Sequence, residues 1–333
     1  MDFDLPQHIR LLKDTVRRFV DSELIPIEMK SMQGAELKPE IRAALEAKTR
    51  EMGFWLLDTP AEYGGQGLSL LALAAIGEEM ARTVALPPRG PGIFGPAVVP
   101  ILLELSDEMK QEYLYPVLRG EKTTSLAQSE PDAGSDPGGM RTRAVRQGEH
   151  YLVNGYKCWI PHAKKADFVQ LVAATDPAKG SRGGLSVFIV DMDSPGVSIV
   201  GETVHMMDDV TYEIAFDDVK VPVRNRVGAE GEGMKQAQSF ISANRIAQAE
   251  RGLGVAARCL EMITKYAKER VTFGRALADR QAVQFAVADL YTKYQLGQML
   301  TYRTAWKIDN GTAARHETYM AKIFCTELAF EAA

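Results

Sequence analysis

The sequence predicts an α+β protein of several domains: an N-terminal helical domain, a central antiparallel β-barrel and a C-terminal helical bundle. Apolar residues recur at helical spacing over residues 1–120. Over residues 121–230 short β-rich runs alternate with turn residues, and over residues 231–333 the helical spacing returns. A chain of 333 residues is long enough for two or three such domains.

The N-terminal helices are predicted from apolar faces. Ile9, Leu12, Val16 and Phe19 share one face of an amphipathic helix, which we expect Pro26 to end. Further helices are expected over residues 41–52, 70–82 and 96–105, with a break at residues 86–92.

The central region is predicted from strand and turn signals. Asn154-Gly155 stands between two β-rich runs, residues 151–153 and 156–160, which is the strongest short signal for a hairpin. Further strands are expected over residues 168–174, 185–190, 197–200, 212–216 and 219–221. Because no helices separate them, they predict a small antiparallel barrel or sandwich instead of βαβ units.

The C-terminal region is predicted to form three long helices. Apolar residues from Ile246 to Ala267 alternate three and four apart, which is typical of a helix packed against neighbouring helices. A second helix is expected over residues 281–309, ended by Asn310-Gly311. A third begins near Arg315 and is still helical in character at Ala333, which predicts that the chain continues beyond it.

Composition narrows the class of protein. The hydrophobic content of 46% and charged content of 25% are typical of a globular protein, and the net charge of −5 disfavours nucleic acid as the main partner. No apolar run predicts a membrane span, and the N-terminus lacks the pattern of a secretory signal. The three cysteines and five histidines are scattered, so we expect no metal site, no disulfide framework and a reducing compartment.

Residues 125–139 combine a strand with a dense turn. The strand half is followed by Pro131, Gly134, Pro137, Gly138 and Gly139, with Asp and Ser residues between them. Such a turn can present several backbone N–H groups in one direction, which makes a cradle for an anion or the edge of a ring. An ordinary surface loop is the alternative for this stretch taken alone.

Several motifs occur in one order along residues 55–330, and together they resemble the acyl-CoA dehydrogenase family. The first is Ser129-Glu-Pro-Asp-Ala-Gly-Ser-Asp136, and the second is Val153-Asn-Gly-Tyr-Lys-Cys-Trp-Ile160. The others are Phe216-Asp-Asp-Val-Lys-Val-Pro222, Gly231-Glu-Gly-Met234 and Arg270-Val-Thr-Phe-Gly274 followed by Gln281. The helical, β and helical organisation of that family agrees with the periodicity.

The resemblance implies that the chain binds FAD and oxidises an acyl-CoA thioester to its 2,3-enoyl form, with electrons passed to an electron-transferring flavoprotein. It also implies a homodimer or a homotetramer in the cytoplasm of a bacterium or in the mitochondrial matrix. The residues expected to contact FAD are Leu126, Gln128, Ser129, Trp159, Ile160, Pro161, Arg270, Thr272, Phe273 and Gln281. The last four are expected to reach the FAD of a neighbouring subunit.

The expected acyl-CoA contacts include departures from the family pattern. These contacts are Ser135, Asp209, Ser242, Asn244 and Arg245. Ser242 replaces an Asp that is common in the family. Asp209 stands where many members have Ser, and its carboxylate disfavours binding of the CoA phosphates.

A third departure concerns the flavin. Pro161 replaces a Thr or Ser whose hydroxyl reaches the flavin in the family, and proline has neither a hydroxyl nor an N–H group.

The catalytic base is not assigned from the sequence. The family places a Glu either beyond the last helix, which here means C-terminal to Ala333, or at the position of Asn244, and an amide cannot act as a base. Glu250 is interpreted as a solvated member of a helical ion pair. Three alternatives therefore stay open: an acyl-CoA oxidase, a flavin monooxygenase of the same fold, and a non-catalytic paralogue that binds flavin or CoA.

Overall fold

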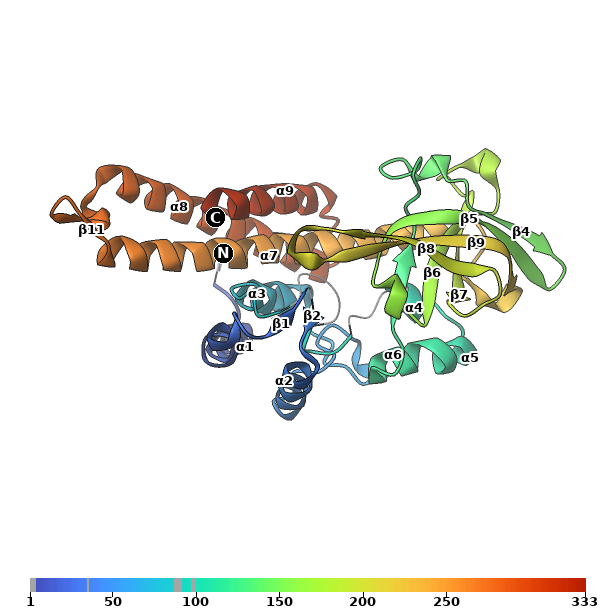
Figure 1. Cartoon of the computed structure of the whole chain (residues 1–333), viewed down its shortest axis with the longest axis horizontal. Helices are drawn as coiled ribbons and strands as arrows, with labels where there is room; N and C mark the ends of the chain where they lie inside the picture. The colour runs from blue at the N-terminus through green and yellow to red at the C-terminus, as the bar shows by residue number, and fades with distance from the viewer. Residues whose placement is uncertain (1–3, 35, 87–91, 97–99) are drawn as a thin grey trace.

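The computed structural model describes residues 4–34, 36–86, 92–96 and 100–333. A sheet-rich region lies at one end of the molecule, three long helices extend away from it, and the N-terminal helices pack along one side (Figure 1). The order of helical, β and helical regions is the predicted one.

The N-terminal region is built from short helices around an apolar core. Its α-helices are α1 (Gln7–Phe19), α2 (Pro39–Glu51), α3 (Leu70–Met80), α4 (Pro100–Leu103), α5 (Asp107–Met109) and α6 (Tyr115–Arg119), with a small hairpin of β1 (Met32–Gln33) and β2 (Glu36–Leu37). The expected break at 86–92 and the start of the helix expected over 96–105 lie largely outside the described residues. Pro26 lies in a 3-10 turn that follows α1 and a short π-helical stretch.

The central region forms one eight-stranded sheet. Its strands are β3 (Thr124–Ala127), β4 (Arg143–Gln147), β5 (His150–Pro161), β6 (Phe168–Ala174), β7 (Leu185–Asp191), β8 (Val197–Val204), β9 (Val210–Pro222) and β10 (Arg226–Val227). The sheet follows the order β10-β7-β6-β4-β5-β9-β8, and β3 pairs with β6. Tyr113 joins it to the N-terminal helices, because its ring packs edge-on against Phe168 at 4.8 Å and its hydroxyl donates to Asp191 at 3.0 Å.

The predicted antiparallel barrel is wrong in two respects. The sheet is not closed, because β8 and β10 end the order and do not pair. The chain leaves the two-residue β10 for a helix whose first residue, Gly233, lies against Ser186 of β7, so a helix covers this edge. The sheet is also mixed, because β3 pairs with β6 in parallel and β4 meets β6 in parallel at Arg143 and Ala174.

The hairpin predicted at Asn154-Gly155 is also wrong. Both residues lie inside β5, and the turn falls earlier, where Gln147 pairs with His150 around Gly148. Asn154 exchanges two 2.9 Å hydrogen bonds with Asp218 at an irregularity of the β5–β9 pairing. Gly155 is required by close packing, because an added Cβ would lie 2.3 Å from Oγ1 of Thr142.

The three C-terminal helices match their predicted positions. They are α7 (Gly233–Glu269), α8 (Gln281–Asp309) and α9 (Arg315–Ala332), and the short hairpin of β11 (Val271–Thr272) and β12 (Arg275–Ala276) joins the first two. The apolar seam of α7, including Ile246, Leu253 and Leu260, is buried against α3, α8 and α9.

The carboxylate of Asp309 links the C-terminal bundle to α3 of the N-terminal region. Asp309, the last residue of α8, accepts hydrogen bonds from the backbone N–H groups of Leu70 and Leu71 at 2.8 and 2.9 Å. These N–H groups begin α3 and have no partner within the helix, so the carboxylate caps α3 and complements its dipole.

We therefore expect Asp309→Ala to destabilise the protein by about 1 kcal/mol and to lower Tm by roughly 2–4 °C. Thermal unfolding followed by circular dichroism measures this. Asp289→Ala removes a carboxylate from the exposed face of the same helix and is the matched control. Equal Tm values for both variants would show that the cap contributes nothing.

Candidate functional site

Two adjacent segments bring together six of the residues predicted to contact FAD. Leu126, Gln128 and Ser129 lie on β3 and directly after it, and Trp159, Ile160 and Pro161 end β5. The backbone N–H of Cys158 donates to the carbonyl of Ser129 at 2.9 Å, and the Ser125 hydroxyl donates to the carbonyl of Pro161 at 2.6 Å.

A β-bulge sets the orientation of Trp159. Lys157 pairs with Ile214 and Ile160 with Tyr212, so two residues of β5 stand opposite one residue of β9. Trp159 takes the left-handed backbone conformation, with φ of 61°, which is strained for a bulky residue and is most often found at functional sites. As a result its indole is 54% exposed, with its ring 6.2 Å from that of His205.

The groups beside Trp159 are free to bind a ligand. Among the described residues, neither the side-chain amide of Gln128 nor the hydroxyl of Ser129 has a hydrogen-bond partner, and both residues are half-buried. An exposed flat indole next to uncommitted donors and acceptors fits a planar ring with polar edges, such as the isoalloxazine of a flavin.

Behind this site lies an ion pair that no sequence pattern predicts. Nζ of Lys157 is 2.8 Å from Oε1 of Glu130, and the side chains are 0% and 4% exposed. Burial lowers the pKa of Lys157 to about 8, although Glu130 opposes the shift. Burial raises the pKa of Glu130, but Lys157 and the donors Thr142 and Arg141 outweigh this, so the pKa lies below its ordinary value.

The predicted acyl-CoA contacts come from three separate elements. Ser242, Asn244 and Arg245 lie on α7, Ser135 is exposed in the turn after β3, and Asp209 is 7% exposed at the tip of the β8–β9 hairpin. The Asp209 carbonyl accepts the backbone N–H of His205 at 2.7 Å.

Among these residues, Arg245 has a defined orientation. Its guanidinium lies 4.8 Å from the ring centroid of Tyr319 on α9, and its Nη1 is buried without a hydrogen-bond partner in the described part of the chain. A buried, unsatisfied donor of this kind is suited to receive a carbonyl or carboxylate oxygen of a ligand.

The remaining predicted FAD contacts do not join the site within one chain. Arg270, Thr272, Phe273 and Gln281 lie at the far end of the bundle, around β11 (Figure 1). Twenty-five residues of α7 separate Arg270 from Arg245, which corresponds to about 38 Å along the helix. Phe273 is 98% exposed and has φ of 50°.

The interpretation of Glu250 as a solvated member of an ion pair is wrong. Its carboxylate packs against α3, where a Cβ added to Gly77 would lie 2.2 Å from it. Burial raises the pKa of Glu250 to about 8, with a further increase from Glu78 and a decrease from Arg251. No sequence pattern indicates this burial, because a Glu between Ala249 and Arg251 on a helix usually faces solvent.

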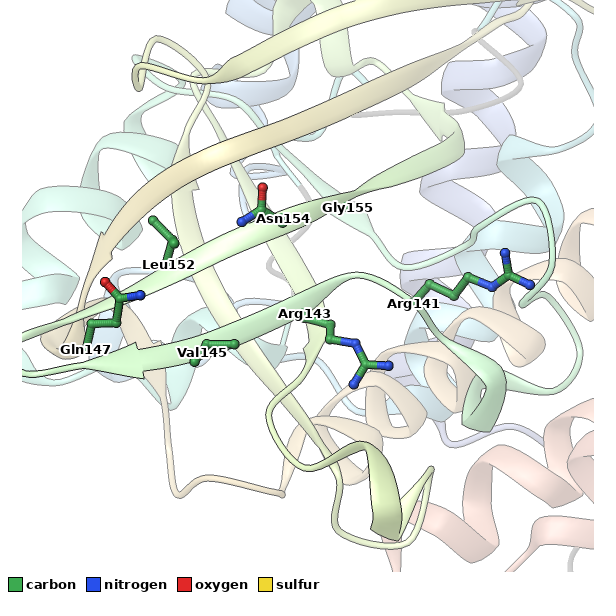
Figure 2. A pocket seen from close by; sticks show the side chains of 7 residues that line it. All are labelled: Arg141, Arg143, Val145, Gln147, Leu152, Asn154 and Gly155. Atoms are coloured by element: carbon green, nitrogen blue, oxygen red, sulfur yellow. The ribbon is translucent and has the colours of Figure 1, made fainter.

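A shallow groove occupies the outer face of β4 and β5. It has a volume of 520 Å³ and is lined by Arg141, Arg143, Val145, Gln147, Leu152, Asn154 and Gly155. The side chains project from the two strands and, for Arg141, from the segment that precedes β4, and they do not converge on one point (Figure 2). None of the predicted site residues lines this groove, and it is not the candidate active site.

In residues 4–34, 36–86, 92–96 and 100–333, no cluster of three or more His, Cys, Asp or Glu side chains is arranged to hold a metal ion. In the same part of the chain, no helix is both long and apolar enough to cross a bilayer.

Three family models match nearly the whole chain. They describe the N-terminal, middle and C-terminal domains of acyl-CoA dehydrogenases and match residues 6–121, 125–219 and 231–333 respectively. These matches define a flavoprotein oxidoreductase, and the chain belongs to the acyl-CoA dehydrogenase family. The family is FAD-dependent, so the cofactor is FAD.

Individual relatives agree with this assignment. The CarC subunit of the caffeyl-CoA reductase–Etf complex of Acetobacterium woodii is 35% identical over 328 residues, which cover 97% of this chain and 85% of the relative. The mitochondrial short-chain specific acyl-CoA dehydrogenase of Mus musculus is 32% identical over 335 residues, covering 98% and 79%. The structure of butyryl-CoA dehydrogenase from Megasphaera elsdenii superposes with a TM-score of 0.83 at 26% identity, covering 100% and 87%.

Proposed function

We propose that this protein oxidises an acyl-CoA thioester to the 2,3-enoyl-CoA and passes the electrons to an electron-transferring flavoprotein. The observation that carries the proposal is the exposed indole of Trp159, held by a bulge beside the uncommitted polar groups of Gln128 and Ser129. Bound FAD would supply the acceptor of the hydride that leaves the β-carbon.

The residues of the site take distinct roles in this proposal. Gln128 and Ser129 donate to the polar edge of the flavin, where negative charge develops on reduction. Trp159 covers the ring system, and Leu126, Ile160 and Pro161 shape its slot. Arg270, Thr272, Phe273 and Gln281 contact the FAD of a second subunit, because they lie too far from the site of their own chain. This arrangement requires a homodimer or a homotetramer.

For the substrate, we propose that Ser135, Asp209, Ser242, Asn244 and Arg245 lie along the acyl-CoA path. Arg245 is the best supported of these, because its buried Nη1 is available to an oxygen of the ligand. The reaction also needs a carboxylate that removes the α-proton, and we assign that role to no residue between Met1 and Ala333, since Asn244 has no basic group.

The relatives support a proposal for the electron acceptor and the compartment. The name of the Acetobacterium relative places it in a complex with an electron-transferring flavoprotein, and the mouse relative is mitochondrial. We propose an electron-transferring flavoprotein as partner here, and the bacterial cytoplasm or the mitochondrial matrix as location.

An anaerobic titration tests the proposed reaction. The purified protein is expected to be yellow, and its flavin absorbance is expected to bleach when an acyl-CoA of suitable chain length is added. A yellow protein that no acyl-CoA bleaches would favour a monooxygenase or a binding role, and a colourless protein that cannot take up FAD would exclude every flavin enzyme. Rapid oxygen uptake after bleaching would identify an oxidase instead of a dehydrogenase.

A reductase is the second candidate, because the Acetobacterium relative carries that name. The same site would then catalyse the reverse reaction, the reduction of an enoyl-CoA to the acyl-CoA. Photoreduced protein mixed anaerobically with an enoyl-CoA distinguishes the two directions. Reoxidation much faster than the bleaching by the matching acyl-CoA would favour the reductase.

Pro161 provides a specific kinetic prediction. It offers no donor to the flavin, and its carbonyl is already bonded to the Ser125 hydroxyl. We expect Pro161→Thr to speed the single-turnover reduction of FAD by about tenfold, which corresponds to one added hydrogen bond worth about 1.4 kcal/mol in the transition state. Stopped-flow absorbance measures the rate, with Pro161→Ala as the control that lacks a hydroxyl. An unchanged rate in Pro161→Thr would refute this role.

A further inference from the structure

The buried pair of Lys157 and Glu130 lies directly behind the candidate flavin site. Removing two charges from water is costly, and an apolar pair of the same volume often serves stability as well or better. Stability alone therefore does not explain why a buried ion pair lies next to a site of charge-separating chemistry.

The pair fastens the segment that carries the flavin contacts. Nζ of Lys157 donates to the Gln128 carbonyl at 2.9 Å as well as to Glu130. The Glu130 carboxylate accepts the backbone N–H groups of Arg141 and Thr142 at 2.6 and 3.0 Å. Residues 128–130 are thus tied to β5 through the ammonium and to the start of β4 through the carboxylate.

The two charges are placed unequally with respect to the site. The ammonium bonds directly to the Gln128 carbonyl, whereas the carboxylate bonds to the ammonium and to the backbone N–H groups of Arg141 and Thr142. A positive charge in a region without water acts strongly on nearby groups. The ammonium of Lys157 therefore favours the form of the bound ligand that carries more negative charge at the edge next to Gln128.

We propose that Lys157 is a positioning residue for the flavin, holding Gln128 and Ser129 in place and favouring the reduced cofactor through its buried charge. The proposal rests on the proposed function, because it takes FAD as the ligand of this site. Glu130 limits the effect of the ammonium and keeps the segment attached to β4.

Opposite shifts of the flavin midpoint potential test the proposal. Lys157→Met leaves Glu130 without its counter-charge and is expected to disfavour reduction about tenfold, which is about 30 mV lower for a two-electron couple. Glu130→Gln removes the carboxylate that helps to keep Lys157 protonated, so its potential is measured at a pH low enough to retain the ammonium. Under that condition the uncompensated ammonium is expected to raise the potential by a similar amount. Lys157→Met/Glu130→Gln removes both charges and is expected to return the potential close to the wild-type value.

A purely structural role gives a different pattern. Loss of the attachment alone would weaken FAD binding in all three variants without opposite shifts of potential. The potential is measured on the FAD-loaded protein by equilibration with a reference dye during enzymatic reduction, and the FAD dissociation constant is measured in parallel. Lys165→Met removes a 63% exposed lysine of the same region and is expected to leave the potential unchanged.

The outcomes separate the proposal from the proposed function. Single variants that shift the potential in the same direction, or by no more than Lys165→Met, would overturn the role of Lys157 even if acyl-CoA reduces the wild type. The role remains testable if Lys157→Met folds but does not retain FAD. In that case a midpoint potential that is raised in Glu130→Gln and restored in the double variant supports the role. An unraised potential in Glu130→Gln refutes it. Wild-type protein that takes up no FAD overturns the proposed function itself.

Discussion

Replacing Glu78 by alanine is expected to destabilise the protein by about 4 kcal/mol, the largest effect of any single change considered for the helical regions. Glu78 on α3 is fully buried. Its carboxylate accepts hydrogen bonds from Lys13 at 3.0 Å, from Tyr302 at 2.5 Å, from Gln298 at 2.9 Å and from Tyr294. The variant would leave the hydroxyls of Tyr294 and Tyr302 on α8 without their acceptor in a dry interior. Lys13 and Gln298 would keep their hydrogen bonds to these two hydroxyls.

Thermal unfolding followed by circular dichroism measures the effect, with an expected fall in Tm of roughly 10 °C. Glu78→Gln keeps the shape and one acceptor but removes the charge, so we expect about half of that loss. Glu40→Ala, on the exposed face of α2, is the control. If Tm of Glu78→Ala stays within measurement error of that control, Glu78 does not organise the bundle.

Replacing Glu250 by glutamine is expected to stabilise the protein at alkaline pH. The folded state raises the pKa of Glu250 to about 8, from an ordinary value of 4.5, chiefly by burial, with Glu78 adding to the shift and Arg251 opposing it. Unfolding therefore releases a proton between about pH 4.5 and 8, and stability falls as the pH rises through that range. Glutamine has no carboxyl group to ionise, so the variant does not lose this stability as the pH rises.

The expected gain at pH 8.5 is about 2 kcal/mol, or roughly 5 °C in Tm, after a discount for the partial exposure of the side chain. The difference in Tm between variant and wild type should grow from pH 5.5 to 8.5. Glu269→Gln, at the exposed end of the same helix, should show no such trend. A difference that is flat with pH would mean that Glu250 is ionised in the folded protein.

The sequence predicted the long helices well because their apolar periodicity extends over many turns. The α8 helix has the expected bounds, Gln281–Asp309, and α9 begins at the expected Arg315. Local signals were less informative in the sheet. Asn154-Gly155 has the chemistry of a hairpin turn, but its glycine serves a close contact with Thr142 and its asparagine bonds Asp218 at a bulge.

Barrel closure could not be predicted, because it depends on which edge strands meet after the chain is folded. Here α7 covers the edge beyond β7, which no pattern within the strands indicates. Buried charges were missed for a related reason. Lys157, Glu78 and Glu250 have the composition of surface residues, and only their tertiary surroundings place them inside.

The candidate site was predicted in part. The motif residues around Ser129 and Trp159 do lie together, and the left-handed conformation of Trp159 and the ion pair behind it could be found only from the structure. The proposed contribution of Arg270 from a second subunit stays a prediction, since one chain places it at the far end of the bundle.

The stoichiometry of a single anaerobic turnover tests the central proposal most directly. FAD-loaded protein is mixed with a limiting acyl-CoA, and the bleached flavin and the acyl-CoA products are quantified together by absorbance and mass spectrometry. The proposed function predicts one 2,3-enoyl-CoA, two hydrogens lighter than the substrate, for each flavin reduced. Flavin that stays oxidised across a range of acyl chain lengths, with no enoyl-CoA formed, would contradict it.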